Sequence, residues 1–169
     1  EYAGATALSN AVKYLSDLEE LNVRTLEENG NYYLKGRLPW VTNARKDRFL
    51  TIFVAGFADD PSTSYVVAVP SDAENFSRSE DLEFVSLQGG NTAALTFNKV
   101  PLKEEWTLSK DAHQFLAQNR PAFLGYQFGL AFGLAERSLS EVEKELGKRG
   151  VLKEEWQHQV EQLDDIRHS

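Results

Sequence analysis

The chain has 169 residues, enough for one compact domain or for one domain with an appendage. Its formal net charge is −8 and no cluster of Lys or Arg appears, which argues against a nucleic-acid-binding protein. The absence of cysteine excludes disulfides, thiolate nucleophiles and cysteine-based metal sites. No apolar run reaches the length of a membrane span and no signal-peptide pattern opens the chain, so we expect a cytoplasmic protein, with a matrix-type compartment as the alternative.

Methionine is also absent, even at position 1. A natural chain of this length normally carries a few. Either the chain is a fragment of a longer protein, or a modified form of methionine is missing from the sequence. Spacings between motifs are therefore read with a tolerance of single residues.

The first 40 residues predict a helix and then a hairpin. Apolar residues recur at a loose helical spacing over 5–21, with a turn at Ser9-Asn10 as the alternative. Asn29-Gly30 predicts a tight turn, because both residues readily adopt positive φ. The returning strand covers 32–38, with Gly36 marking a bulge.

Further strands follow in quick succession. β-branched and aromatic residues predict a buried strand at 49–57, a turn at 59–62 and a second strand at 64–69. Strands are also expected at 82–87 and 93–97, separated by a break at 89–91. Short strands with regularly spaced turns favour an antiparallel sandwich or barrel.

After Pro101 the sequence shows no strand pattern and becomes helical. Two helices are predicted at 111–148 and 151–166, joined by Gly147-Lys148-Arg149-Gly150 as an antiparallel hairpin. We therefore expect an α+β chain, with a β-domain over 1–108 and part of a helical-bundle domain over 109–169.

Few residues suggest chemistry on their own. The three histidines do not have metal-ligand spacing, so no metal site is predicted. The segment Pro39-Trp40-Val41-Thr42-Asn43 follows a strand, and there a Trp can stack on a planar ring while a Thr hydroxyl donates to a ring nitrogen. Judged by residue type alone, the favoured interpretation is a strand end where Trp40 fills the core and Thr42-Asn43 caps a turn.

The segments around Trp40-Val41-Thr42-Asn43 favour a different interpretation. Asn29-Gly30 followed by Trp40-Val41-Thr42-Asn43 resembles a pattern of the acyl-CoA dehydrogenase family, although Lys35 replaces the family's common asparagine. The segments 89–92 and 95–101 resemble the family's next turn and strand, and 119–121 and 129–139 resemble its first long C-terminal helix. The resemblance runs in the right order over most of the chain, so we expect the middle β-domain and the start of the C-terminal helical domain.

The resemblance implies an FAD-dependent oxidoreductase that acts on the CH–CH group of acyl-CoA thioesters. Residues matching Trp40 and Thr42 lie along the isoalloxazine, with Trp40 against one face and Thr42 donating to N5, while the backbone of Val41 contacts the ring edge. Thr6 and Ser9 fall in the stretch that supplies flavin and pyrophosphate contacts. Arg120 either faces the acyl pocket or forms a salt bridge.

The resemblance leaves the catalytic residue unknown. Most members place the catalytic glutamate beyond the position of Ser169, and the alternative position is Asn119 here, which cannot act as a base. Expected partners are an electron-transfer flavoprotein and further copies of the chain, as a homodimer or homotetramer. Two alternatives stay open: a flavin-dependent monooxygenase of the same fold, and a non-catalytic binding or scaffold module.

Overall fold

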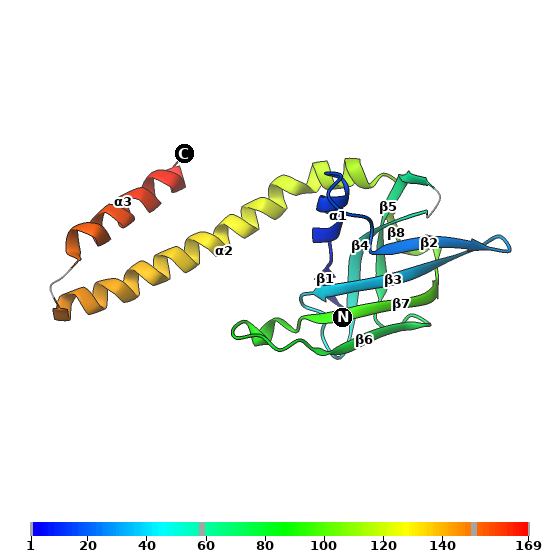
Figure 1. The fold of residues 1–169 in the computed structure, drawn as a ribbon, viewed down its shortest axis with the longest axis horizontal. Coiled ribbons are helices and arrows are strands. Elements are labelled where there is room, and N and C mark those ends of the chain that lie inside the picture. Colours follow the sequence, from blue (N-terminus) through cyan, green and yellow to red (C-terminus); the bar gives the residue numbers. More distant parts are fainter. Residues whose placement is uncertain (1, 58–59, 150–151, 169) are drawn as a thin grey trace. The chain divides into compact units, whose positions relative to one another are not determined.

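The computed structural model describes residues 2–57, 60–149 and 152–168 (Figure 1). The chain divides into two compact units, Glu1–Ala117 and Gln118–Ser169. The first unit contains an eight-stranded sheet and a short helix, and the second is helical, which confirms the predicted α+β class.

The sheet has the strand order β6-β7-β3-β2-β4-β5-β8, and β1 pairs separately with β4. Its elements in chain order are β1 (Ala3–Thr6), α1 (Ser9–Tyr14), β2 (Val23–Glu28), β3 (Asn31–Val41), β4 (Phe49–Phe57), β5 (Asp60–Pro70), β6 (Phe76–Asp81), η1 (Gln88–Gly90), β7 (Ala93–Pro101), η2 (Glu104–Trp106) and β8 (Thr107–Ser109). The expected turn at 59–62 lies partly outside the described residues.

The predicted antiparallel pairing is confirmed for most of the sheet, but β1 and β2 both pair with β4 in parallel. β1 pairs with residues 49–52 of β4, and β2 pairs with Gly56 and Phe57. After β1 the chain moves away from β4 and passes through α1. It then returns as β2, which pairs with a later part of β4 and runs in the same direction as β1. Such a pairing depends on contacts distant in sequence, which local patterns do not encode.

Two apolar clusters lie on opposite sides of the central strands. The larger includes the fully buried side chains of Phe53, Leu95 and Phe97, and the rings of Phe53 and Phe97 are 4.8 Å apart. The smaller joins Val54 and Val66 of the sheet to Ala11 of α1 and Ala112 of α2. α1 is therefore packed against the sheet, which fixes the segment that precedes β2.

The Asn29-Gly30 turn is confirmed, with φ of 52° and 76° at its two residues. The predicted bulge at Gly36 was wrong. The register shift between β3 and β7 leaves Lys99 as the extra residue, with φ of 59°. Gly36 instead allows a close approach, because a Cβ there would lie 2.0 Å from the carbonyl oxygen of Asn22.

Three other local predictions required correction. The helix expected over 5–21 is limited to α1, because Ala5 is a fully buried strand residue paired with Thr51. No strand forms over 82–87, where Val85 and Leu87 are exposed and Leu87 has a left-handed φ of 62°. The sequence pattern missed β8, whose three residues pair with β5.

Both C-terminal helices are confirmed, as α2 (Ala112–Arg149) and α3 (Lys153–His168). Pro121 lies inside α2 and cannot donate a backbone hydrogen bond to Ala117, the last residue of the first unit. Within the second unit, the indole Nε1 of Trp156 donates to the carbonyl of Leu139 at 3.0 Å. Arg167 also pairs with Glu136, so α3 is tied to α2 by polar contacts.

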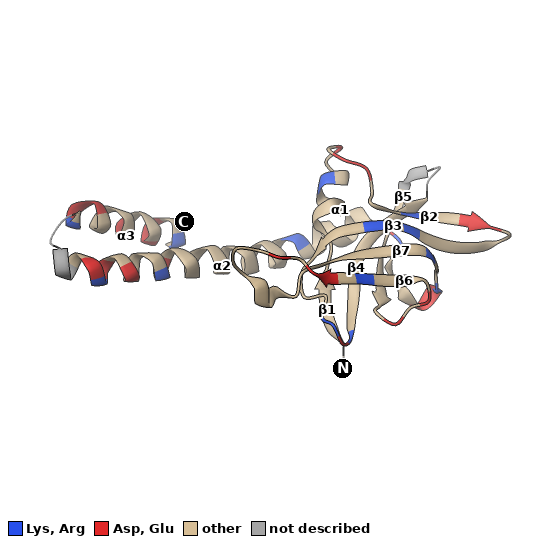
Figure 2. Ribbon diagram, turned by 60° about the horizontal axis from the view of Figure 1, so that its bottom comes forward, with Lys and Arg blue, Asp and Glu red and all other residues tan. Residues whose placement is uncertain are grey.

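Charge is unevenly distributed along α2. Residues 121–135 contain no Asp, Glu, Lys or Arg, whereas α2 from Glu136 onward and α3 carry many (Figure 2). Even so, no helix among the described residues is long and apolar enough to cross a membrane.

Candidate functional site: the groove beside Trp40

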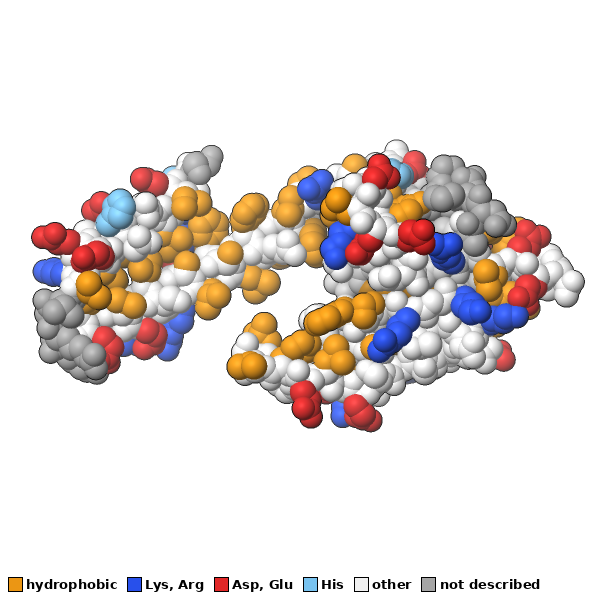
Figure 3. All heavy atoms as spheres, in the orientation of Figure 1, with side chains coloured by type: hydrophobic (Ala, Val, Ile, Leu, Met, Phe, Trp, Pro, Cys, Tyr) orange, Lys and Arg blue, Asp and Glu red, His pale blue; other side chains and the backbone are white. Residues whose placement is uncertain are grey.

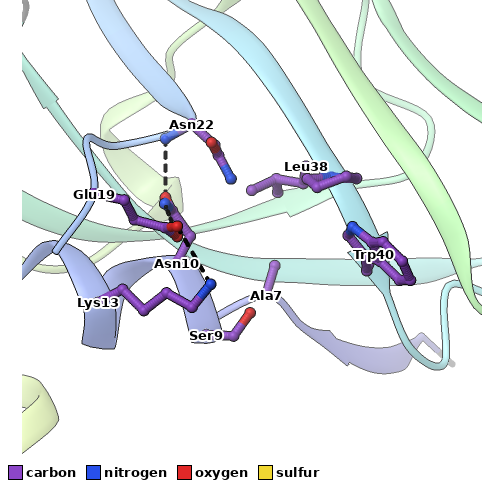
Figure 4. Close-up of a pocket in the computed structure, with 9 residues that line it drawn as sticks. Ala7, Ser9, Asn10, Lys13, Glu19, Asn22, Leu38 and Trp40 are labelled. Carbon is purple, nitrogen blue, oxygen red and sulfur yellow. Dashed lines mark hydrogen bonds and ion pairs between the residues drawn. The ribbon is translucent and has the colours of Figure 1, made fainter.

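A groove of about 280 Å³ lies between α1 and the end of β3 (Figure 4). Figure 4 shows Leu38 and Trp40 on one side, with Asn10, Lys13 and Glu19 facing them from the other. The nine lining residues are Ala7, Ser9, Asn10, Lys13, Glu19, Asn22, Leu38, Pro39 and Trp40. One wall is therefore largely apolar and aromatic, while the other carries polar and charged groups.

The end of β3 and the residue after it expose two side chains. Val41 is fully buried and pairs with Ala93 of β7, whereas Trp40 is 67% exposed and Thr42 is also exposed. A register shift between Leu38 and Val41 interrupts the regular alternation of β3, so both of these residues are buried and Trp40 between them is left exposed. The interpretation in which Trp40 fills the core is wrong.

Asn43 holds this strand end in place. It adopts a left-handed φ of 60°, which Asn tolerates better than most residues. Its backbone N–H donates to the carbonyl of Gly90 at 2.8 Å, and its side-chain amide donates to the carbonyl of Gly4 at 2.8 Å. The segment after Trp40 is thus anchored both to η1 and to β1.

The polar wall is organised around Asn10, which is 7% exposed. Its amide nitrogen donates to the carboxylate of Glu19 and to the carbonyl of Glu20, both at 2.9 Å. Its oxygen accepts the backbone N–H of Asn22 at 2.9 Å. These bonds fold the chain after α1 back onto the helix.

Glu19 is also bonded to the ammonium of Lys13 at 3.3 Å. The pKa of Glu19 is lowered from its ordinary value, first by the hydrogen bond from Asn10 and then by Lys13, against the opposing effect of partial burial. The carboxylate is therefore held in its charged form beside a cation.

The structure brings together some of the predicted site residues. Ser9 and Trp40 line the same groove, whereas Thr42 is exposed just beyond the end of β3 and does not line the groove. Thr6 is exposed on β1, two residues beyond the Gly4 carbonyl that binds Asn43. Arg120 is exposed on α2 and belongs to the second unit.

The sequence pattern missed the polar wall formed by Asn10, Lys13, Glu19 and Asn22. The helical pattern did not mark Asn10, because it lies away from the apolar stripe of Leu8 and Val12 and makes its hydrogen bonds to the segment after the helix. Within the described part of the chain, no group of three His, Cys, Asp or Glu side chains could hold a metal ion.

No family model matches the sequence, and no curated protein matches it. Solved structures do match. A probable acyl-CoA dehydrogenase from Mycobacterium abscessus is 19% identical, with a TM-score of 0.73 over 96% of this chain and 46% of its own. A prolyl acyl carrier protein oxidase is 15% identical, with a TM-score of 0.73 over 99% and 47%.

A third match is a glutaryl-CoA dehydrogenase from Mycobacterium smegmatis in complex with FADH2, 22% identical, with a TM-score of 0.60 over 81% of this chain and 34% of its own. The chain thus spans less than half the length of these solved structures. At this level of identity the likeness lies in the fold. The chain has the fold seen in acyl-CoA dehydrogenases, over a region that takes in a β-domain and two helices.

Proposed function

We propose that this chain is the flavin-holding part of an FAD-dependent oxidoreductase that acts on the CH–CH group of acyl-CoA thioesters. The observation that carries the proposal is the outward display of Trp40 and Thr42 at the end of β3, within this fold. The FADH2 bound to the glutaryl-CoA dehydrogenase supports the choice of cofactor.

The residues present fit a flavin ring. The exposed indole of Trp40 offers an apolar face for stacking, and the exposed hydroxyl of Thr42, two residues farther along the chain, supplies a hydrogen-bond donor. The buried Val41 side chain holds the intervening backbone in place, and we propose that the backbone of Val41 contacts the ring edge. Bound FAD would accept the hydride, while these residues orient and hold it.

The exposed hydroxyls of Thr6 and Ser9 are proposed to contact the flavin and its pyrophosphate. We propose that Arg120 faces the acyl group, and the catalytic base stays unassigned. An electron-transfer flavoprotein as acceptor, a homodimer or homotetramer packed through the C-terminal helices, and a cytoplasmic location complete the proposal. The region 1–108 is proposed as the β-domain and 109–169 as part of the helical domain.

The test uses the full-length protein that carries this chain. Purified protein is expected to be yellow, or to become so on reconstitution with FAD, and an acyl-CoA should bleach the flavin absorbance under anaerobic conditions. Bleaching only by an external reductase, followed by oxygen consumption, would instead support a monooxygenase. Protein that stays colourless after reconstitution would overturn both flavin functions and favour a non-catalytic module.

A further inference from the structure

Thr42 and Thr92 lie just beyond the end of the β3–β7 ladder. Its last pair is Val41 with Ala93, and both are fully buried. Thr42 directly follows Val41 and Thr92 directly precedes Ala93, so the ladder brings the two threonines close together. Their hydroxyl oxygens are 3.3 Å apart, within hydrogen-bond distance.

The backbone of Thr92 is held by a hydrogen bond from Leu82 and by the buried residue that follows it. Its carbonyl accepts the backbone N–H of Leu82 at 2.8 Å, and the next residue, Ala93, is fully buried. Across the ladder, the hydrogen bond from Asn43 to Gly90 closes the same loop at 2.8 Å. The two hydroxyls are therefore brought together by the backbone rather than by chance rotation of surface side chains.

A threonine hydroxyl carries one proton, which it can give to only one acceptor. If Thr42 donates to Thr92, its proton is used within the protein. If Thr92 donates to Thr42, the proton of Thr42 is left for an outside acceptor, and the bond it accepts strengthens its own donation. A ligand acceptor beside Thr42 favours the second arrangement, because all the donors are then used.

We propose that Thr92 is a positioning residue that orients the Thr42 hydroxyl and frees its proton for a ring nitrogen of the bound flavin. This inference rests on the proposed function. Thr92 itself touches no reacting atom and acts through Thr42. Its side chain is expected to tune the rate of flavin reduction without changing the affinity for the acyl-CoA.

The experiment compares Thr92→Val, Thr92→Ser, Thr42→Val and the double variant in the full-length flavoprotein. The readouts are the rate of anaerobic flavin reduction by acyl-CoA, the flavin midpoint potential, and kcat and KM. Thr92→Val is expected to slow reduction about fivefold and to lower the potential, with KM unchanged. Thr92→Ser keeps the donor and should restore both. The double variant should be no slower than Thr42→Val alone, because Thr92 acts through Thr42.

The outcomes separate the two proposals. Protein that takes up no FAD overturns the proposed function and this inference together. If Thr42→Val slows reduction but Thr92→Val does not, or if the two effects multiply in the double variant, only the role of Thr92 is overturned. If Thr92→Val lowers the melting temperature, Thr92→Ala replaces it, since its smaller side chain removes the donor without adding a methyl group.

Discussion

Trp40 differs from the other large aromatic residues at the centre of the first unit. Phe49 and Phe53 are 2% and 0% exposed, whereas Trp40 is 67% exposed. Replacing an exposed side chain usually changes stability by less than about 0.5 kcal/mol. Trp40→Ala should therefore leave the free energy of unfolding nearly unchanged, while loss of the stacking surface weakens FAD binding about tenfold.

Urea unfolding and flavin dissociation measured on the same sample check both parts. Leu18→Ala is the matched control, because Leu18 is 75% exposed and does not line the groove. It should keep both stability and FAD affinity. Unfolding of the Trp40→Ala variant, or undiminished flavin affinity, would contradict a ligand-facing role for Trp40.

Gly36 differs from Trp40 because its role is structural and it does not line the groove. A Cβ at this position would meet the Asn22 oxygen at 2.0 Å and the Cα of Val23 at 2.8 Å, and φ is 150°. Gly36→Ala should thus cost on the order of 3 kcal/mol, measured from the urea midpoint. Gly4→Ala is the control, since nothing lies within 4 Å of its added Cβ. Equal midpoints for the two variants would refute the close approach of β2 and β3.

At the scale of elements, α1 is held by the segment that follows it. A helix of six residues is too short to be stable alone. Asn10 bonds Glu19, Glu20 and Asn22, so the return of the chain to β2 depends on this buried amide. The polar wall of the groove therefore exists only when the turn after α1 is closed.

Because Glu19 is charged, the stability of the turn after α1 should depend on pH. Its folded pKa lies below its ordinary value of 4.5, so the stability it contributes is present above that pH and is lost as the pH falls through the lowered folded pKa. Melting temperatures of the wild type and Glu19→Gln should differ by a constant margin near neutral pH, and the margin should shrink in acid. A margin that persists at the acid end would show that the Glu19 charge is not involved.

The elements that depend on local sequence were predictable. Asn29-Gly30 specified its turn, and the long helical patterns gave α2 and α3. β8 and the parallel pairing of β1 were missed because they depend on partners about 40 residues away. The 82–87 segment has strand-like residues, but the backbone turns at Leu87 and leaves them exposed.

For the site, the sequence motif located Trp40 and Thr42, while Asn10, Glu19 and Thr92 emerged only from contacts between residues that are distant in the sequence.

At the scale of the whole molecule, the middle of α2 carries a group of exposed apolar side chains. Tyr126, Leu130 and Leu134 are 80%, 77% and 71% exposed and follow one another at helical spacing. Figure 3 shows hydrophobic side chains, in orange, on the surface along the long helix. Phe128, on another side of the helix, is 60% exposed. A helix that is apolar on several sides is normally buried, and exposed patches of this kind mark interfaces in soluble proteins.

The proposed homodimer or homotetramer packed through these helices can therefore be tested on α2. Leu130→Lys combined with Leu134→Lys should shift the protein towards monomer in sedimentation velocity, because burying each leucine contributes about 2 kcal/mol and burying an unpaired ammonium is costly. The control pair, Leu18→Lys with Leu108→Lys, adds the same charge at exposed leucines of the first unit and should leave the assembly intact. An unchanged sedimentation coefficient in the α2 variant, with the wild type associated, would place the interface elsewhere. A wild type that is already monomeric would contradict self-association, and α2 would then need a different covering partner.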